Sequence, residues 1–326
     1  MHILHNTHNC PEALKGATLA IGNFDGVHRG HQAVLRVALD RAHASGALSG
    51  VMSFEPHPRA FFQPGKPMFR LTPQALKLRL FEALGLDMAV VLPFNAELAA
   101  RPAEDFVRDI LVEGLGVSHV ITGGDFHFGK GRDGNPDVLR ALGESYGFGV
   151  TIVAPQAGEG GVFSSTQIRD HLREGDPRGA AESLGYWWRV AGEVIGGDKR
   201  GHGLGFPTAN IAVPDGFALK HGIYAVRVRT EGVQYHGAAY LGTRPSFDDG
   251  DPVIETFLFG FDGDLYGQEI ELEVIEFLRD DEKFESSEAL KAQMKSDCEA
   301  AEKSLLRLDA NDPFAPGLLG GAPDGC

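Results

Sequence analysis

The chain is poor in cysteine, with only three among its 326 residues. Cys10, Cys298 and Cys326 lie near the two ends and show neither paired nor metal-binding spacing. An odd and sparse set of this kind indicates a reducing compartment and argues against a disulfide framework.

Long apolar runs are also missing. No stretch approaches the roughly 18 uninterrupted apolar residues that a membrane-spanning helix requires. The opening residues, MHILHNTHNC, lack the charged start and the apolar run of a signal peptide. We therefore expect a cytoplasmic protein that has no membrane partner.

Basic residues are outnumbered, since 30 Lys and Arg stand against 45 Asp and Glu, which gives a formal net charge of −15. This balance argues against nucleic acid as a partner, because anionic phosphate backbones are bound by basic surfaces. It is compatible with a small anionic ligand, because a local site can be positive inside a negative protein.

The first half of the chain alternates strand-like and helix-like segments, and the whole length fits about two domains. This alternation predicts an α/β domain with a doubly wound, Rossmann-like parallel sheet, whose ligands bind at the carboxyl ends of the strands. The expected strands are Thr18–Ile21, Gly50–Phe54, Met88–Leu92, His119–Thr122 and Val150–Val153; the expected helices are Gly30–Ala44, one begun by Pro73 and capped by Thr72, Pro102–Leu115, and Asp137–Gly147.

The second half changes to short alternating β-segments separated by glycine and proline, which predicts a small antiparallel β-barrel. We expect domains at 1–184 and 185–309, with Gly185–Trp188 as a linker or domain start, and a disordered tail at 310–326. The expected strands are Arg189–Ile195, Gly222–Arg229, Tyr235–Leu241, Glu255–Phe259 and Ile270–Phe277, followed by a closing helix, Glu288–Arg307, that Ser286 or Ser287 caps.

The stretch Ile21–Leu35, IGNFDGVHRGHQAVL, combines the end of a strand, a glycine-rich turn and a helix start. Backbone N–H groups and the positive end of the helix dipole make such a place a phosphate site. His28 and His31 stand at the helix start, and their side chains tilt back toward the same anion. The alternative is that both are polar residues at the start of a surface helix, but the context favours a phosphate site.

A second anion site is predicted where Ser164, Ser165 and Thr166 precede a short helix, Gln167–Arg173. Hydroxyls at a helix start can simply cap the helix, and they can also bind phosphate oxygens. Because Arg169 lies in the first turn and the histidine motif comes earlier, we favour a second phosphate clamp.

The segment Gly196–Asn210, GGDKRGHGLGFPTAN, is rich in glycine and carries two basic residues. Its backbone amides could fold over phosphates. Thr208 and Asn210 place oxygen ligands on one face of an extended segment, and such hard ligands together with nucleotide phosphates hold Mg²⁺. The alternative for this segment is a glycine-rich surface hairpin.

Glu255 lies at the start of a β-segment, where a carboxylate could act as a general base toward a hydroxyl. By itself this glutamate would more often be a solvent-facing strand residue. The family resemblance of the whole chain favours the catalytic role.

The chain resembles the bacterial bifunctional riboflavin kinase/FAD synthetase (FMN adenylyltransferase) family over nearly all of residues 15–307. Many independent motifs in the family's order make the resemblance specific, whereas His-x-Gly-His alone indicates only the wider nucleotidyltransferase superfamily. The matching stretches are IGNFDGVHRGHQ (21–32), SFEPHP (53–58), TGGDFHFGKGRDGN (122–135), SSTQIRDHLREGD (164–176), GDKRGHGLGFPTANI (197–211), HGIYAV (221–226), LGTRPSF (241–247), IETFLFGFDGDLYG (254–267) and FLRDDEKF (277–284).

For the second domain the resemblance implies a kinase that phosphorylates the ribityl 5′-hydroxyl of riboflavin with Mg-ATP and gives FMN. Glu255 matches the catalytic base, Thr208 and Asn210 match the Mg²⁺ and nucleotide ligands, and Arg279 matches an arginine near the flavin. The phosphate loop of the family is matched by Gly197, Lys199, Gly201, Gly205 and Pro207.

For the first domain the resemblance implies transfer of AMP from ATP to FMN, with release of pyrophosphate and formation of FAD. His28, His31 and Arg169 match residues that neutralise the phosphates during the reaction. The ATP-binding matches are Gly22, Asn23, Phe24, Asp25, Gly30, Asp125, Ser164, Ser165 and Thr166, and the flavin-binding matches are Phe54, His57, Pro58 and Phe62.

Three positions depart from the family pattern in the kinase motifs, since Tyr240, Phe257 and Gly260 stand where Asn, His and Asp are usual. None of them is assigned a catalytic role. We therefore expect a two-step enzyme whose partners are riboflavin, FMN and ATP, with no nucleic acid or membrane partner and with weak homo-oligomerisation. The alternatives are an enzyme with one active module, the kinase being the weaker, and a flavin-binding carrier without activity.

Overall fold

The structure is a computed structural model that describes residues 1–196, 208–243, 252–314 and 318. The chain divides into two compact units, Met1–Ser165 and Thr166–Cys326. No helix among the described residues is long and apolar enough to cross a membrane. Both units have the predicted fold class.

The first unit is built on a sheet of six parallel strands in the order β1-β4-β3-β2-β5-β6. The strand order reverses at β2 and β5, and in doubly wound sheets the ligand crevice lies at the carboxyl ends of the strands at such a switch point. The strands are β1 (His2–Leu4), β2 (Thr18–Ile21), β3 (Ser49–Glu55), β4 (Met88–Pro93), β5 (His119–Gly123) and β6 (Gly149–Val153).

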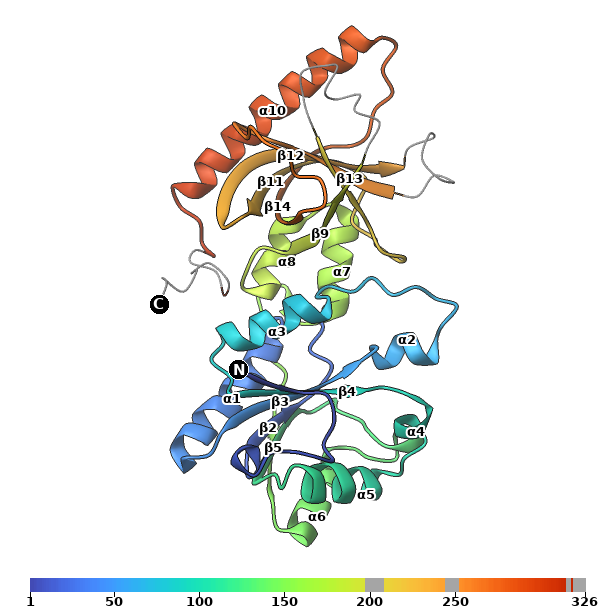
Figure 1. Ribbon diagram of the computed structural model, residues 1–326, viewed down its shortest axis with the longest axis vertical. Coiled ribbons are helices and arrows are strands. Elements are labelled where there is room, and N and C mark those ends of the chain that lie inside the picture. The colour runs from blue at the N-terminus through green and yellow to red at the C-terminus, as the bar shows by residue number, and fades with distance from the viewer. Residues whose placement is uncertain (197–207, 244–251, 315–317, 319–326) are drawn as a thin grey trace. The chain divides into compact units, whose positions relative to one another are not determined.

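Helices cover both sides of this sheet, and Figure 1 shows α3 on one side and α5 and α6 on the other. The first helix, α1 (Arg29–Ser45), begins at an N-cap, His28, and ends at Gly46, whose φ of 70° suits glycine. The other elements of this unit are η1 (Glu12–Leu14), α2 (Pro58–Phe62), α3 (Gln74–Ala83), α4 (Ala96–Ala99), α5 (Ala103–Asp105), η2 (Phe106–Gly114), η3 (Lys130–Arg132), α6 (Pro136–Tyr146), and the short strands β7 (Ala157–Gly158) and β8 (Gly161–Val162).

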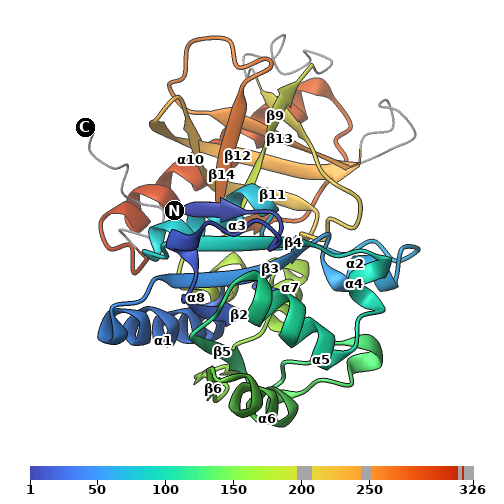
Figure 2. The same ribbon diagram turned by 60° about the horizontal axis from the view of Figure 1, so that its bottom comes forward.

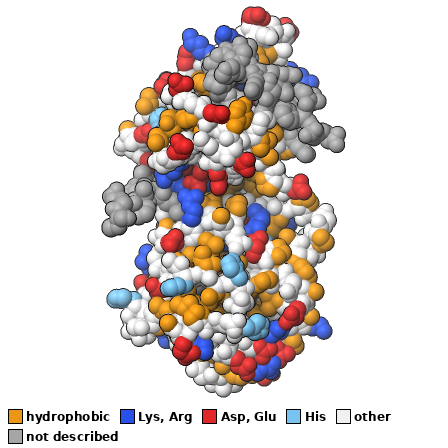
Figure 3. Space-filling model, in the orientation of Figure 1, with side chains coloured by type: hydrophobic (Ala, Val, Ile, Leu, Met, Phe, Trp, Pro, Cys, Tyr) orange, Lys and Arg blue, Asp and Glu red, His pale blue; other side chains and the backbone are white. Residues whose placement is uncertain are grey.

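The core of the first unit lies between the sheet and these helices, where β2, β3 and β4 supply residues such as Leu19, Met52 and Val90. Burying this apolar surface provides the main stabilisation of the unit. On the surface, Figure 3 shows acidic and basic side chains mixed at the end that carries α5 and α6.

The structure adds two points to the expectations for this unit. The helix expected at Pro102–Leu115 is present, and it consists of a short α5 followed by a π-helix, η2. Apolar residues spaced four or five apart fit either kind of helix, so their spacing did not distinguish them. The edge strand β1 was not predicted, because its three residues, HIL, are too few to show alternation.

The second unit begins with α7 (Ser165–Glu174) and α8 (Pro177–Leu184) and continues as the predicted antiparallel barrel. The barrel is closed in the order β10-β13-β12-β11-β14-β9, and its strands curve around a common centre in Figure 2. The elements are β9 (Arg189–Ile195), β10 (Ala209–Ala212), β11 (Gly222–Thr230), β12 (Val233–Thr243), β13 (Pro252–Leu258), β14 (Glu269–Arg279) and the closing helix α10 (Ser287–Asp309).

Helix α10 lies along the outside of the barrel (Figure 1), and Ser286 caps it by accepting a hydrogen bond from the N–H of Ala289. Its residues Ala301 and Leu305 pack with Ala225 and Ile275 of the barrel. Strand β11 is therefore buried on both faces, one inside the barrel and one under the helix.

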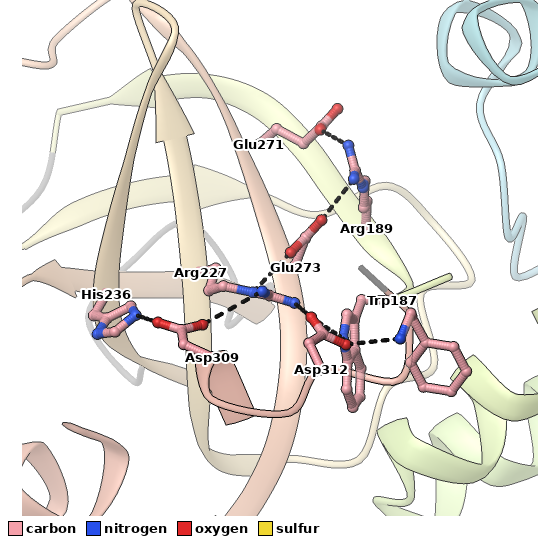
Figure 4. A network of polar contacts seen from close by, with 9 residues as sticks. Trp187, Arg189, Arg227, His236, Glu271, Glu273, Asp309 and Asp312 are labelled. Carbon is pink, nitrogen blue, oxygen red and sulfur yellow. Dashed lines mark hydrogen bonds and ion pairs between the residues drawn. The ribbon is translucent and has the colours of Figure 1, made fainter. Parts of the chain in front are cut away.

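A buried ionic network ties the end of the described chain to this barrel (Figure 4). Arg227 forms ion pairs with Asp312 at 2.6 Å and with Glu273 at 2.9 Å. Arg189 also pairs with Glu273, at 2.6 Å, and Asp312 accepts a hydrogen bond from Nε1 of Trp187 at 3.1 Å.

These contacts correct one expectation. The first residues of the tail that was expected to be disordered make packed contacts, because Asp312 is paired in this network and Phe314 packs against Trp187 with ring centroids 5.2 Å apart. The segment Gly185–Trp188, which was expected to be a linker or a domain start, contains three buried aromatic side chains, Tyr186, Trp187 and Trp188, and so does not have the exposure of a linker.

Candidate active sites

The loop at residues 22–28 connects β2 to α1 at the carboxyl edge of the parallel sheet. His28 caps the helix, because its Nδ1 accepts the backbone N–H of His31 at 3.3 Å. The two imidazoles stack with their centroids 3.6 Å apart. The motif therefore places two histidines side by side at the N-terminus of a helix, where an anion is favoured.

The environment of His31 disfavours its charged form. Burial, together with the nearby His28 and Lys77, holds the pKa of His31 well below its usual range. Its Nδ1 is buried and has no hydrogen-bond partner among the residues that the structure describes. The ring thus carries an unused polar atom next to the helix N-terminus, although part of the residue stays accessible.

Two of the residues predicted to bind ATP point into the protein instead of outward. The ring of Phe24 is 2% exposed and packs edge-on against His31 and Phe81. The carboxylate of Asp25 accepts the backbone N–H groups of Leu71 at 3.1 Å and of Thr72 at 3.1 Å. Their side chains shape the loop, while Asn23 is exposed at its surface.

Thr72 does not cap a helix as the sequence suggested, because α3 begins after Pro73 without any side-chain cap. Its hydroxyl accepts the backbone N–H of Gly26 at 2.9 Å and contacts Asp25 at 3.3 Å. A threonine before proline resembles a cap in the sequence, but a contact across the fold determines its position.

The second predicted phosphate motif meets this loop. The hydroxyl of Ser165, the first residue of α7, donates to the backbone carbonyl of Asp25 at 2.7 Å. A Cβ at Gly30 would lie 3.1 Å from the ring of His28, closer than an ordinary contact, so glycine leaves room for the capping imidazole. Thr166 and Arg169 follow on the same helix, and Arg169 is buried.

The residues predicted to hold the flavin lie at the end of β3 and in α2. His57 caps α2 by accepting the N–H of Arg59 at 3.1 Å, and Pro58 opens the helix. Phe62 is 63% exposed, which is unusual for a large apolar side chain and typical of a binding surface.

Phe94 joins this aromatic surface and was not predicted from the sequence. Its ring centroid lies 6.0 Å from that of Phe54, 5.4 Å from that of Phe61 and 5.6 Å from that of Phe62. Its position directly after β4 was the available signal, because Phe54 lies near the end of the neighbouring strand β3, and Phe61 and Phe62 lie in α2, which follows β3 at the same sheet edge. Asp125, predicted to bind ATP, is exposed in the loop after β5.

In the second unit, strand register brings together the predicted kinase residues. Asn210 on β10 lies directly opposite Glu255 on β13, and Glu255 lies opposite Tyr240 on β12. The same row continues through Ile223 on β11 to Arg279 on β14. Directly opposed residues have Cβ atoms about 5 Å apart, so Asn210 and Glu255 are side-chain neighbours.

Glu255, Tyr240 and Arg279 of this row are half-buried and lie toward the outer face of the barrel, whereas Asn210 is only 5% exposed. Ala209, Ile211, Ile254 and Thr256 alternate with the row and are at most 5% exposed. Thr208 precedes β10 and falls on the same side as Asn210, because side chains alternate along an extended chain.

Arg279 is held by the closing helix. Its guanidinium donates to both carboxylate oxygens of Asp297 on α10, at 2.8 and 2.7 Å. This hydrogen-bonded contact with Asp297 outweighs burial and raises the pKa of Arg279. Asp297 was not singled out from the sequence, because an acidic residue within a charged surface helix gives no special signal.

The departure at Tyr240 has a structural setting. Its hydroxyl donates to Asp281 at 3.0 Å, and its ring occupies the space where a side chain at position 242 would stand, so Gly242 is required there.

The phosphate-loop predictions Gly197, Lys199, Gly201, Gly205 and Pro207 lie outside the described residues.

Comparison with known proteins identifies a family for each part of the chain. Residues 10–167 match the FAD synthetase family model and residues 184–305 match the riboflavin kinase model. A bifunctional riboflavin kinase/FMN adenylyltransferase of Pseudomonas fluorescens is 39% identical over 92% of this chain and 97% of that protein. The protein of the same description from Escherichia coli K12 is 36% identical over 91% of this chain and 96% of that protein.

The chain belongs to the bifunctional riboflavin kinase/FMN adenylyltransferase family. A crystal structure titled as a macrolide-efflux protein from Streptococcus pneumoniae has the same architecture, with a TM-score of 0.82 and 27% identity over 92% of this chain and 98% of that one. That match supports the two-part fold of the family. Its title describes that protein alone.

The FAD synthetase model ends at residue 167 and the riboflavin kinase model begins at residue 184. The residues between them form most of α7 and α8. The compact units divide at Ser165, and the sequence suggested a boundary at 184. The domain limits 1–184 and 185–309 stay a prediction of the sequence pattern.

Proposed function

We propose that this chain makes FAD from riboflavin in two steps. The barrel unit phosphorylates the ribityl 5′-hydroxyl of riboflavin with Mg-ATP, giving FMN and ADP. The parallel-sheet unit then joins FMN to the AMP part of a second ATP, giving FAD and pyrophosphate. The observation that carries the proposal is that relatives with this pair of activities in their names match both units nearly from end to end.

In the kinase step, Glu255 accepts the proton of the 5′-hydroxyl while the oxygen attacks the γ-phosphate of ATP. Asn210, directly across from Glu255, binds the nucleotide beside the reacting hydroxyl. Arg279 lies three strands from Glu255 around the closed barrel, and it is assigned to the flavin because it matches the arginine near the flavin in the family pattern.

The donor chemistry on this side of β10 fits Mg²⁺. The hydroxyl of Thr208 and the amide oxygen of Asn210 are hard oxygen ligands, which Mg²⁺ prefers in combination with nucleotide phosphates. When bound, the ion would neutralise phosphate charge. Chelation of divalent metal is expected to stop both reactions, and a kinase step that survives chelation would contradict the roles of Thr208 and Asn210.

In the adenylyl transfer, a phosphate oxygen of FMN attacks the α-phosphate of ATP and pyrophosphate leaves. No covalent enzyme intermediate is needed, so the unit has to align two anions and offset their charge. The helix N-terminus beside His28 and His31, the amides of the loop at 22–28 and the start of α7 supply donors for the triphosphate. Arg169 supplies a positive charge on the same helix.

The flavin of FMN is assigned to the aromatic surface formed by Phe54, Phe61, Phe62 and Phe94. An isoalloxazine ring is flat and aromatic, and rings of this kind stack favourably on exposed phenylalanine.

ATP as a shared co-substrate favours a cytoplasmic location. Weak self-association of the chain stays a prediction, and sedimentation velocity can test it.

A product time course with riboflavin and Mg-ATP tests the proposal. FMN should accumulate first and FAD should follow. If FAD forms only when FMN is supplied, the chain is an adenylyltransferase without kinase activity. If riboflavin or FMN binds and neither product forms, the chain is a flavin carrier and the proposal is wrong.

A further inference from the structure

The nucleotide loop at 22–28 adopts a backbone that its sequence disfavours. Phe24 has a φ of 50° and Val27 a φ of 37°, in the left-handed region that suits glycine. For a β-branched residue such as valine this conformation is a genuine outlier. Strain of this kind persists only where the surroundings hold it in place, and it gathers at functional sites.

Lys77 provides one of the contacts that hold the loop. It lies on α3, is 2% exposed, and its Nζ donates to the backbone carbonyl of Asn23 at 3.2 Å. A lysine this deeply buried is rare unless it is paired. The side chain of Asn23 is exposed. The hydrogen bond from Lys77 therefore holds the backbone of Asn23 from the buried side of the loop and leaves its exposed side accessible.

The charges around Lys77 show how its burial is tolerated. Burial and the nearby Arg70 lower the pKa of Lys77, while Asp25 and Glu55 act in the opposite direction. Glu55 is held by both guanidinium nitrogens of Arg70 at 2.6 and 2.8 Å. Acidic groups from the loop and from β3 thus offset the buried cation.

Thr72 holds the same loop from a second position. Its hydroxyl is fully buried, accepts the N–H of Gly26 at 2.9 Å and contacts the carboxylate of Asp25 at 3.3 Å. The loop is therefore held at 23 by a lysine and at 25 and 26 by a threonine. Neither residue belongs to the sequence motif of the loop.

We propose that Thr72 and Lys77 are positioning residues of the adenylyltransferase, which clamp the strained loop at 22–28 in the form that binds the phosphates of ATP. The inference rests on the proposed function of this unit. Neither side chain needs to touch ATP. They act through the loop backbone, whose N–H groups and helix start face the nucleotide.

The test uses Lys77→Met and Thr72→Val in the full chain, because both substitutions remove the polar contact and nearly keep the side-chain volume. FMN adenylylation is measured with ATP and FMN varied separately. We expect kcat/KM for ATP to fall by about 10- to 100-fold, mainly through a higher KM for ATP, because misplacement of a binding loop is costly. KM for FMN and the phosphorylation of riboflavin should stay unchanged.

The split between KM and kcat separates positioning from mere instability, since a smaller folded fraction lowers the apparent kcat and leaves KM for ATP as it was. Thr72→Ser keeps the hydroxyl and should retain the wild-type KM. Two matched controls are expected to match the wild type. Lys66→Met removes an exposed lysine, and Thr18→Val removes a buried hydroxyl that lacks a hydrogen-bond partner among the described residues.

Wild-type KM values for ATP in both Lys77→Met and Thr72→Val would overturn the inference. It also fails if Thr72→Ser is as defective as Thr72→Val, because the hydroxyl would then not be the group that matters. If the wild-type chain itself does not adenylylate FMN, the proposed function fails instead, so the two failures are distinguishable.

Discussion

The two candidate sites are built in opposite ways. In the first unit one short loop and one helix start supply the phosphate-binding groups around His28 and His31, so these residues are neighbours in the sequence. In the barrel, Asn210, Glu255, Tyr240 and Arg279 come from four different strands and share one row only because of the strand register. A local motif makes the first site, and long-range pairing makes the second.

The difference extends to what stabilises each site. The loop at 22–28 is strained, and buried polar groups behind it hold its shape. The kinase row stands on strands of the barrel, with one irregularity in the pairing of β11 and β14 next to Ile223, while the ionic network and α10 hold the barrel. We therefore expect substitutions at the first site to lower activity by displacing its loop. Substitutions around the second site should either lower the rate of the kinase reaction or lower the stability of the barrel.

The largest effect is expected for Glu255→Gln. Loss of a general base typically costs 10²- to 10⁴-fold, so FMN formation from riboflavin should fall by about that factor. FAD formation from supplied FMN should continue at the wild-type rate. Product separation with riboflavin or FMN as the starting material measures both steps.

Glu269→Gln is the matched control for this substitution, because Glu269 is an exposed glutamate at the start of β14. It should leave both steps unchanged. If Glu255→Gln stops both steps in a folded chain, the assignment of one reaction to each unit is wrong.

The next effect is expected for the double change His28→Ala and His31→Ala. It removes the helix cap and the two stacked imidazoles, so FAD formation should fall by about 10²- to 10³-fold, as for the loss of groups that stabilise a transition state. Riboflavin phosphorylation should stay intact. His43→Ala, at the exposed other end of α1, is the control and should keep both activities.

A smaller effect, on stability and not on chemistry, is expected for Arg227→Met. The change leaves Asp312 buried without its closest cation, and breaking a buried ion pair costs about 3–5 kcal/mol. The second unit should melt at a lower temperature, which tryptophan fluorescence reports because both tryptophans lie there. Arg307→Met removes an exposed arginine of α10 and should leave the melting temperature unchanged.

The contrast between the two sites also explains how far the sequence could lead. Alternation and glycine turns predicted the parallel sheet and the barrel, and the compact motif predicted the loop with His28 and His31. The contacts of Thr72 and Lys77 with the loop were not predicted, because these residues are separated from the loop by about 50 residues of chain. No periodicity or local signal encodes such a contact.

For the barrel the limit was of another kind. Thr208, Asn210 and Glu255 were named from motif identity, but their mutual placement depends on register, which a sequence alone does not specify. Asp297 and Asp312 were missed because an acidic residue in a charged helix or in a glycine-rich tail is ordinary by composition. Only the fold shows that they meet Arg279 and Arg227.

The smallest expected effect is a loss of stability at low pH, and it should differ between the two units. His119 begins β5, is 7% exposed and contacts Thr151 at 2.8 Å. Burial, with Arg41 nearby, lowers the pKa of His119 from 6.5 to about 4. Between these values the unfolded chain binds a proton that the folded chain does not, so the first unit loses stability as the pH falls from 6.5 to about 4.

The second unit should respond only in stronger acid. Burial raises the pKa of Asp312, but the N–H of Phe314, Arg227 and Trp187 outweigh it, and the net pKa lies below 3.8. A carboxyl with a lowered pKa contributes stability that is lost only as the pH falls below its unfolded value. At pH 4.5, compared with pH 7, the circular dichroism transition of the first unit should move to lower temperature before the tryptophan transition does. The substitution His119→Gln should reduce that shift, and an equal shift in both transitions would show that the two units do not differ in this way.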